Sequence, residues 1–179
     1  MRKIIIALCM VLICLLTGCS RNEAKFVGSR DTEGFSCDTE TYQSVGELLK
    51  NSELIVIGTA GKPKEVTEEF YGEILYASKI QITIKEVLKG TVNSASVNVL
   101  QTGKPNSDNY ETKLKENGEY LLFLNSKTFC GETVYDCTGI EQGIVEINPD
   151  SSLYSYADFG ISATFDNKSV KTLKEELVG

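Results

Sequence analysis

Cysteine is the most chemically versatile residue type in this chain, which contains no histidine. The 179 residues include 6 Cys and no His. Without His there is no Ser–His or Cys–His triad, no imidazole acid–base catalyst and no His-ligated metal. The close C-x-x-C spacing of zinc and redox motifs is also missing, so we expect no metal and no cofactor. The cysteines are Cys9, Cys14, Cys19, Cys37, Cys130 and Cys137.

Serine and carboxylate chemistry shows no convincing arrangement either. No Ser-x-x-Lys occurs in the chain, which removes one nucleophile that works without His. The neighbouring pairs Glu68–Glu69 and Glu175–Glu176 direct their carboxylates to different faces of a strand or helix. We therefore predict no catalytic residues. An envelope enzyme that uses carboxylate or Cys chemistry remains the alternative.

The first nineteen residues have the features of an export signal. Arg2 and Lys3 precede the apolar run Ile4–Leu16, which is shorter than the roughly 20 residues of a membrane-spanning helix. We interpret residues 1–18 as a cleaved signal peptide. The alternatives are a secretory signal without lipid attachment and a chance match.

The end of this segment carries a four-residue motif, Leu16-Thr17-Gly18-Cys19. It resembles the lipobox of bacterial lipoproteins, in which the Cys thiol receives a diacylglyceryl group and becomes the first residue after cleavage. The resemblance implies that Cys19 attaches the protein to the lipid bilayer, on the outer face of the cell membrane. Two acyl chains anchor a protein stably, whereas one is marginal.

The charge of the chain bears on its partners. The formal net charge is −7, and loss of Arg2 and Lys3 with the signal peptide makes it −9. An acidic body is a poor ligand for nucleic acid and is repelled by anionic lipid. Residues 19–41 are polar and aperiodic after Cys19, so we interpret them as a flexible tether. The folded domain is expected over residues 42–179.

Three cysteines follow the anchor, in a compartment that permits disulfides. Cys130 and Cys137 lie on either side of an expected turn at residues 131–133, and we predict that they bond across a small hairpin. A bond from Cys37 to either of them is the alternative.

Tyrosines mark the candidate interaction surface. Tyr71, Tyr76 and Tyr110 fall in the segments 62–76 and 102–117, which we interpret as loops. Tyr provides rigid amphipathic contact area, and an envelope protein or a glycan would be the partner. Alternatively, these rings simply pack on the core.

The elements that must position these residues are mostly strands. Ser44 and Glu47 have capping-box spacing and predict a helix over 43–51. Apolar alternation and β-branched runs predict consecutive strands, which favours a mainly β fold, a small antiparallel barrel with one N-terminal and one C-terminal helix. The strands are expected at 54–58, 80–88, 97–99, 119–124, 133–135, 143–147 and 153–156, and the second helix at 169–177.

Three short motifs resemble those of a known superfamily. They are Val87–Gly90, Gly118–Leu124 and Gln142-Gly143. In order and spacing they resemble the netrin-like, or tissue-inhibitor-of-metalloproteinase-like, OB-fold proteins that occur as bacterial exported lipoproteins. The resemblance implies an OB-like barrel. It does not imply metalloprotease inhibition, because the mature N-terminal residue Cys19 would be acylated.

Together these observations predict a membrane-anchored extracytoplasmic lipoprotein that acts as a non-catalytic binding module. A purely structural envelope protein is a further alternative.

Overall fold

The computed structural model describes residues 41–70, 73–103, 105, 113–157, 161–165 and 168–178. All of these belong to one compact unit, Cys37–Gly179. The expected signal peptide, the lipobox with Cys19 and the tether up to residue 40 lie outside the described residues. So do Cys37, Tyr71 and Tyr110.

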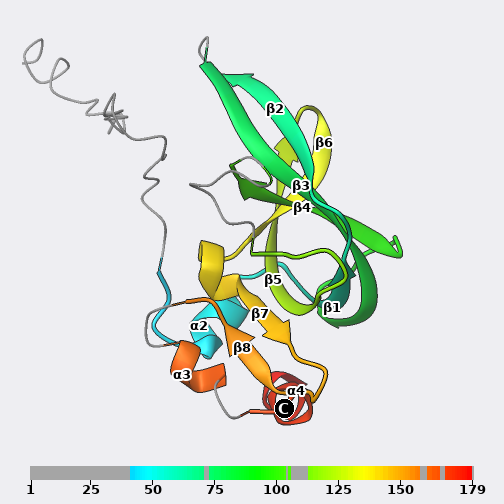
Figure 1. The fold of residues 1–179 in the computed structure, drawn as a ribbon. Helices are drawn as coiled ribbons and strands as arrows, with labels where there is room; N and C mark the ends of the chain where they lie inside the picture. The colour runs from blue at the N-terminus through cyan, green and yellow to red at the C-terminus, as the bar shows by residue number, and fades with distance from the viewer. Residues whose placement is uncertain are drawn as a thin grey trace, which may run out of the picture. The chain divides into compact units, whose positions relative to one another are not determined.

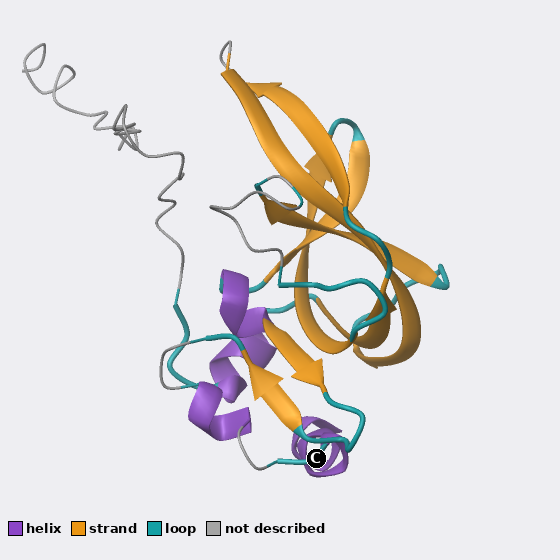
Figure 2. Cartoon of the chain, viewed as in Figure 1, coloured by secondary structure: helices purple, strands orange, loops and turns teal. Residues whose placement is uncertain are grey.

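Strands dominate the described chain, which confirms the mainly β class, and the helices gather beside β7 and β8 (Figures 1 and 2). A short helix, α3, was not expected from the sequence. The elements are α2 (Val45–Lys50), β1 (Leu54–Ala60), β2 (Lys64–Phe70), β3 (Glu73–Lys89), β4 (Ser96–Thr102), β5 (Glu119–Phe129), β6 (Glu132–Cys137), the 3-10 helix η1 (Ile140–Gly143), β7 (Ile144–Ile147), β8 (Leu153–Ser155), α3 (Ser162–Phe165) and α4 (Val170–Val178).

Five of the strands pair in a closed circuit. β1 pairs antiparallel with β3 on one edge and with β5 on the other, while β3 pairs antiparallel with β4 and β5 with β6. β4 and β6 complete the circuit in parallel, through Val99–Tyr135 and Leu100–Asp136. The expected all-antiparallel arrangement is therefore wrong. An odd number of strands cannot alternate in direction around a closed circuit, so one pair must be parallel.

The inside of this circuit is the first apolar core. Ile80 and Ile82 are fully buried, whereas Gln81 and Thr83, which alternate with them, are exposed, so the alternation predicted from the sequence is confirmed. The core residues with them include Leu54, Val56, Val97, Val99, Tyr120, Leu122, Leu124 and Ile144.

A second core lies on the opposite face of β1 and β5. Strand β5 pairs with β7 through Tyr120–Leu122 and with β6 through Leu124–Phe129, and β8 pairs with β7. Helices cover this face: Phe123 of β5 packs against Phe165 of α3, with ring centroids 6.3 Å apart. Leu48 of α2 and Leu173 of α4 are buried in the same cluster.

The capping box of α2 forms as the spacing predicts, with one difference. The Ser44 hydroxyl accepts from the Glu47 N–H at 3.2 Å. The Glu47 carboxylate accepts from the N–H of Gln43 at 2.8 Å, one residue earlier than in the usual reciprocal pair. The side chains of Ser44 and Glu47 therefore both accept hydrogen bonds from backbone N–H groups at the start of the helix.

The segment 62–76 is not the loop that the sequence suggests. β2 and the beginning of β3 occupy it and pair in register from Lys64–Lys79 to Phe70–Glu73. A two-stranded ribbon outside the main core needs little apolar burial on either face. The charged residues of this segment therefore interrupt the apolar alternation by which a strand is recognised in the sequence.

Candidate binding site

Two β-hairpins extend beyond the five-strand circuit and meet each other. We call residues 64–79 the first arm and residues 125–136 the second arm, and their contact the arm junction. In Figure 1 both arms extend on the side away from α3 and α4. The arm junction is therefore well separated in the fold from the helix-covered core.

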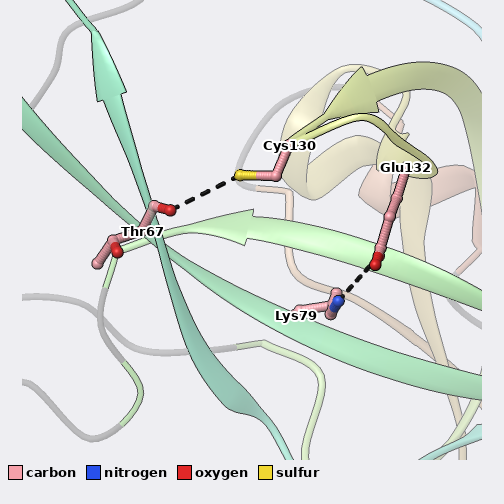
Figure 3. Close-up of polar contacts among 4 residues, drawn as sticks. All are labelled: Thr67, Lys79, Cys130 and Glu132. Carbon is pink, nitrogen blue, oxygen red and sulfur yellow. Dashed lines mark hydrogen bonds and ion pairs between the residues drawn. The ribbon is translucent and has the colours of Figure 1, made fainter.

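Polar contacts join the arms, as Figure 3 shows. The Cys130 thiol donates to the carbonyl oxygen of Thr67 at 3.7 Å. Lys79 forms an ion pair with Glu132, with the ammonium nitrogen 3.1 Å from a carboxylate oxygen. Lys79 lies directly opposite Lys64 in the first arm, so the carboxylate of the second arm offsets a repulsion between like charges in the first.

A small third apolar core also joins the two arms. Ala77 of β3, Leu100 of β4 and Val134 of β6 are buried together, and the half-buried Val66 and Phe129 pack against them. Each arm contributes apolar side chains, so the junction is a packed contact and not only a pair of surface polar bonds. The exposed side chains Thr67, Thr128 and Thr133 lie around it.

The structure places one of the predicted interaction residues at this site. Tyr76 lies in the first arm, half-buried, and its carbonyl oxygen accepts from the N–H of Gly103 at 2.9 Å. Tyr71 and Tyr110 fall outside the described part of the chain. The sequence did not reveal Lys79 and Glu132, because nothing local shows that residues so far apart would meet.

The predicted disulfide between Cys130 and Cys137 is wrong in this structure, where both thiols are free. The turn consists of Cys130 itself (φ 49°) and Gly131 (φ 78°), since Phe129 already pairs with Glu132. Cys137 stands at the far end of β6. A strand rises about 3.3–3.4 Å per residue, so β6 alone separates the cysteines by roughly 17–20 Å, whereas a disulfide needs Cα atoms within about 7 Å.

The first of the three sequence motifs positions α2. The Lys89 ammonium donates to the carbonyl oxygens of Leu49 at 2.6 Å and Ser52 at 2.7 Å, which satisfies carbonyls at the end of the helix. Gly90 follows with φ 84°, and a Cβ there would lie 2.5 Å from the carbonyl oxygen of Glu53. Both residues therefore lie where the end of β3 contacts the connection between α2 and β1.

The Gln142-Gly143 motif positions the point where the chain enters the domain. The buried Gln142 side chain accepts from the N–H of Tyr42 at 2.8 Å and donates to its carbonyl oxygen at 3.0 Å. A Cβ on Gly143 would lie 2.5 Å from the carbonyl oxygen of Thr138 and 2.9 Å from that of Phe123. Glycine permits this close backbone approach.

The Gly118–Leu124 motif secures the connection into β5. The buried Tyr120 hydroxyl accepts from the N–H of Lys115 at 2.9 Å and donates to the carbonyl oxygen of Lys113 at 3.2 Å. A Cβ on Gly118 would lie 2.6 Å from the Tyr120 ring. The side chains of Lys89, Tyr120 and Gln142 thus all bind the backbone of their own chain, so these three residues stabilise the fold.

The pKa shifts have local structural causes. The pKa of Glu53 is lowered because its carboxylate accepts hydrogen bonds from the hydroxyl and N–H of Ser126. Burial raises the pKa of the Cys137 thiol, and the neighbouring Asp136 adds to the effect. Burial also raises the pKa of Tyr156, whose hydroxyl donates to the Glu146 carboxylate. None of these groups lies among the polar contacts of the arm junction.

Two further features concern the described ranges only. No cluster of three or more Cys, Asp and Glu side chains there could hold a metal ion. No helix among the same residues is long and apolar enough to cross a membrane.

Comparisons with known proteins add little. No protein-family model matches the chain, and no curated protein matches it either. Among solved structures it is similar to the OB domain of a Thermoplasma acidophilum protein, determined by NMR in solution. The identity is 14%, the match covers 52% of this chain and 76% of that one, and the TM-score is 0.32. A likeness this distant carries no argument, and the netrin-like and lipoprotein resemblances stay predictions.

Proposed function

We propose that this protein is a lipid-anchored, non-catalytic binding module on the extracytoplasmic face of the cell membrane, with an OB-like barrel as its body. The five-strand circuit supports the barrel, because β1 pairs on both edges and the pairings return to it. In OB-folds, ligands bind at one face of the barrel and the loops beside it. We expect no cofactor, and no nucleic acid among the partners, because the chain is acidic.

The arm junction is the observation that carries the binding role. Two hairpins project beyond the core and are fixed to each other by the Cys130–Thr67 contact, the Lys79–Glu132 ion pair and a small apolar cluster. A rigid projecting surface with exposed polar side chains loses little entropy when it binds. The partner we propose is an envelope protein or an envelope glycan.

Crosslinking in cells tests this assignment. A photo-reactive amino acid replaces Thr128, which is exposed on the second arm, and in a matched control replaces Lys171, which is exposed on α4. We expect a discrete crosslinked product from position 128 and none from position 171. Equal products from both positions, or none from either, would contradict the assignment of the arm junction.

The anchor has its own test. The proposed lipid acceptor is Cys19, within Leu16-Thr17-Gly18-Cys19. Cys19→Ser should release the protein from membranes, since no other thiol has the lipobox context. Retention of the variant on membranes after a high-salt wash would refute lipid attachment at this residue.

A further inference from the structure

A second cluster of functional side chains lies at the β7–β8 end of the sheet, where α3 also lies, away from the arms (Figure 1). The rings of Tyr154 and Tyr156 stand nearly perpendicular, at 88°, with centroids 5.1 Å apart. Tyr154 is 52% exposed. Tyr156 is half-buried and donates its hydroxyl hydrogen to the Glu146 carboxylate. The pair therefore has one exposed ring, that of Tyr154, and one ring whose position is fixed by a hydrogen bond to a carboxylate.

This cluster already holds one ammonium group, that of Lys113. Its nitrogen lies 5.6 Å from the centroid of the Tyr156 ring and 3.4 Å from a carboxylate oxygen of Glu141. An ammonium over a Tyr face is attracted by the ring quadrupole, and the carboxylate adds an ion pair. With Glu146 the cluster has two carboxylates for one ammonium, so it keeps an excess of negative charge beside its exposed ring.

The Lys113 side chain is not what holds its segment in place. The Lys113 carbonyl oxygen accepts from the Tyr120 hydroxyl, and the Lys115 N–H donates to the same hydroxyl. Between them, Leu114 is fully buried and its N–H donates to the Gln101 side chain at 3.2 Å. The backbone is therefore held by contacts that do not involve the Lys113 side chain, which is 26% exposed.

We propose that the surface formed by Tyr154, Tyr156 and Glu141 binds a primary alkylammonium group of an external ligand, such as a lysine side chain, and that Lys113 is its internal occupant. The ligand's ammonium replaces that of Lys113 over the Tyr156 ring and beside Glu141. No covalent step is involved. This site stands independently of the arm junction, and its failure would leave the proposed function untouched.

The test uses n-butylammonium chloride as the probe and the chain without the proposed signal peptide, residues 19–179. Binding is followed by the NMR signals of the Tyr154 and Tyr156 rings, at constant ionic strength. Removal of the internal competitor by Lys113→Met should tighten binding about tenfold, which is the scale of an exposed ion pair plus a cation–π contact. Glu141→Gln in the Lys113→Met background should reverse that gain.

Two controls make the result specific. Lys115→Met removes the same charge from an exposed neighbour, and its backbone N–H contact with Tyr120 is unaffected, so its affinity for the probe should equal that of the unmodified chain. The neutral 1-butanol should not shift the Tyr rings. Lys113→Gln replaces Lys113→Met if the latter does not fold. Equal affinities for the Lys113 and Lys115 variants, binding of 1-butanol as tight as that of the ammonium, or no shift of either ring would overturn the proposal.

Discussion

Gln142→Leu should loosen the entry of the chain into the domain and destabilise the fold. The substitution keeps most of the side-chain volume but removes both hydrogen bonds to the Tyr42 backbone, at 2.8 and 3.0 Å. Each such bond contributes about 0.5–1.5 kcal/mol net, so the expected loss of unfolding free energy is about 1–3 kcal/mol. For a domain of this size we expect Tm to fall by about 4 °C per kcal/mol.

Urea denaturation of residues 20–179 measures this loss, and Gln43→Leu serves as the matched control because Gln43 is exposed. The control should stay within about 0.5 kcal/mol of the unmodified chain. Amide hydrogen exchange adds a local readout, since the Tyr42 N–H loses its acceptor and should exchange faster than amides of the central strands. If Gln142→Leu matches the control in stability and the Tyr42 amide stays protected, the reasoning is refuted.

Three further outcomes follow from the contacts. Lys89→Met should lower the free energy of unfolding in urea by about 1.5–3 kcal/mol, because charged hydrogen bonds to carbonyl oxygens are lost. The control Lys85→Met, which loses an exposed ion pair, should lower it by less than about 1 kcal/mol. Equal losses would show that the Lys89 contacts do not stabilise α2. The pKa of Glu53 is lowered in the folded state, so its carboxylate contributes fully to stability above the ordinary pKa of 4.5, and this contribution is lost as the pH falls through the folded-state pKa. Glu53→Gln should therefore weaken the loss of stability at acid pH. An unchanged dependence of stability on acid pH would rule this out. A thiol reagent at neutral pH should label the exposed Cys130 much faster than Cys137, whose pKa burial raises; similar rates by peptide mass spectrometry would contradict that burial.

The features that the sequence predicted correctly depend on neighbouring residues. The Ser44–Glu47 capping box and the alternation of Ile80 and Ile82 each operate within a few positions along the chain, and the structure contains both. Local periodicity also identified the central strands and hence the mainly β class. The boundaries were less accurate: β3 begins at Glu73 and not at Ile80. Its first residues lie in the first arm, where Ala77 and Ser78 are buried but Ile74 is exposed, so no regular apolar alternation marks the strand.

The features that the sequence missed depend on distant residues or on turn geometry. The parallel pairing of Val99 with Tyr135 follows from closure of a circuit of strands, which no local pattern encodes. The turn at Cys130 and Gly131 uses two positive φ angles, and the sequence reading placed it one residue too late. Because of this displacement, Cys130 and Cys137 were expected to lie opposite each other across a hairpin. In the structure they lie at opposite ends of β6. The candidate site at the arm junction was missed because Lys79 and Glu132 are far apart in the sequence and meet only in the folded chain.

The single parallel pair in the circuit has a consequence for the order in which the chain folds. Hairpins such as β2–β3 and β5–β6 join strands that are adjacent along the chain and form early, whereas β1 pairs with β5, Leu54 with Leu124, only after the intervening chain has been made. β4 gains its second neighbour later still, when β6 arrives. Until then β4 is an open edge, available to other chains. A chain shortened before Glu132 would keep that edge permanently, so truncation at this point should favour aggregation over a smaller stable domain.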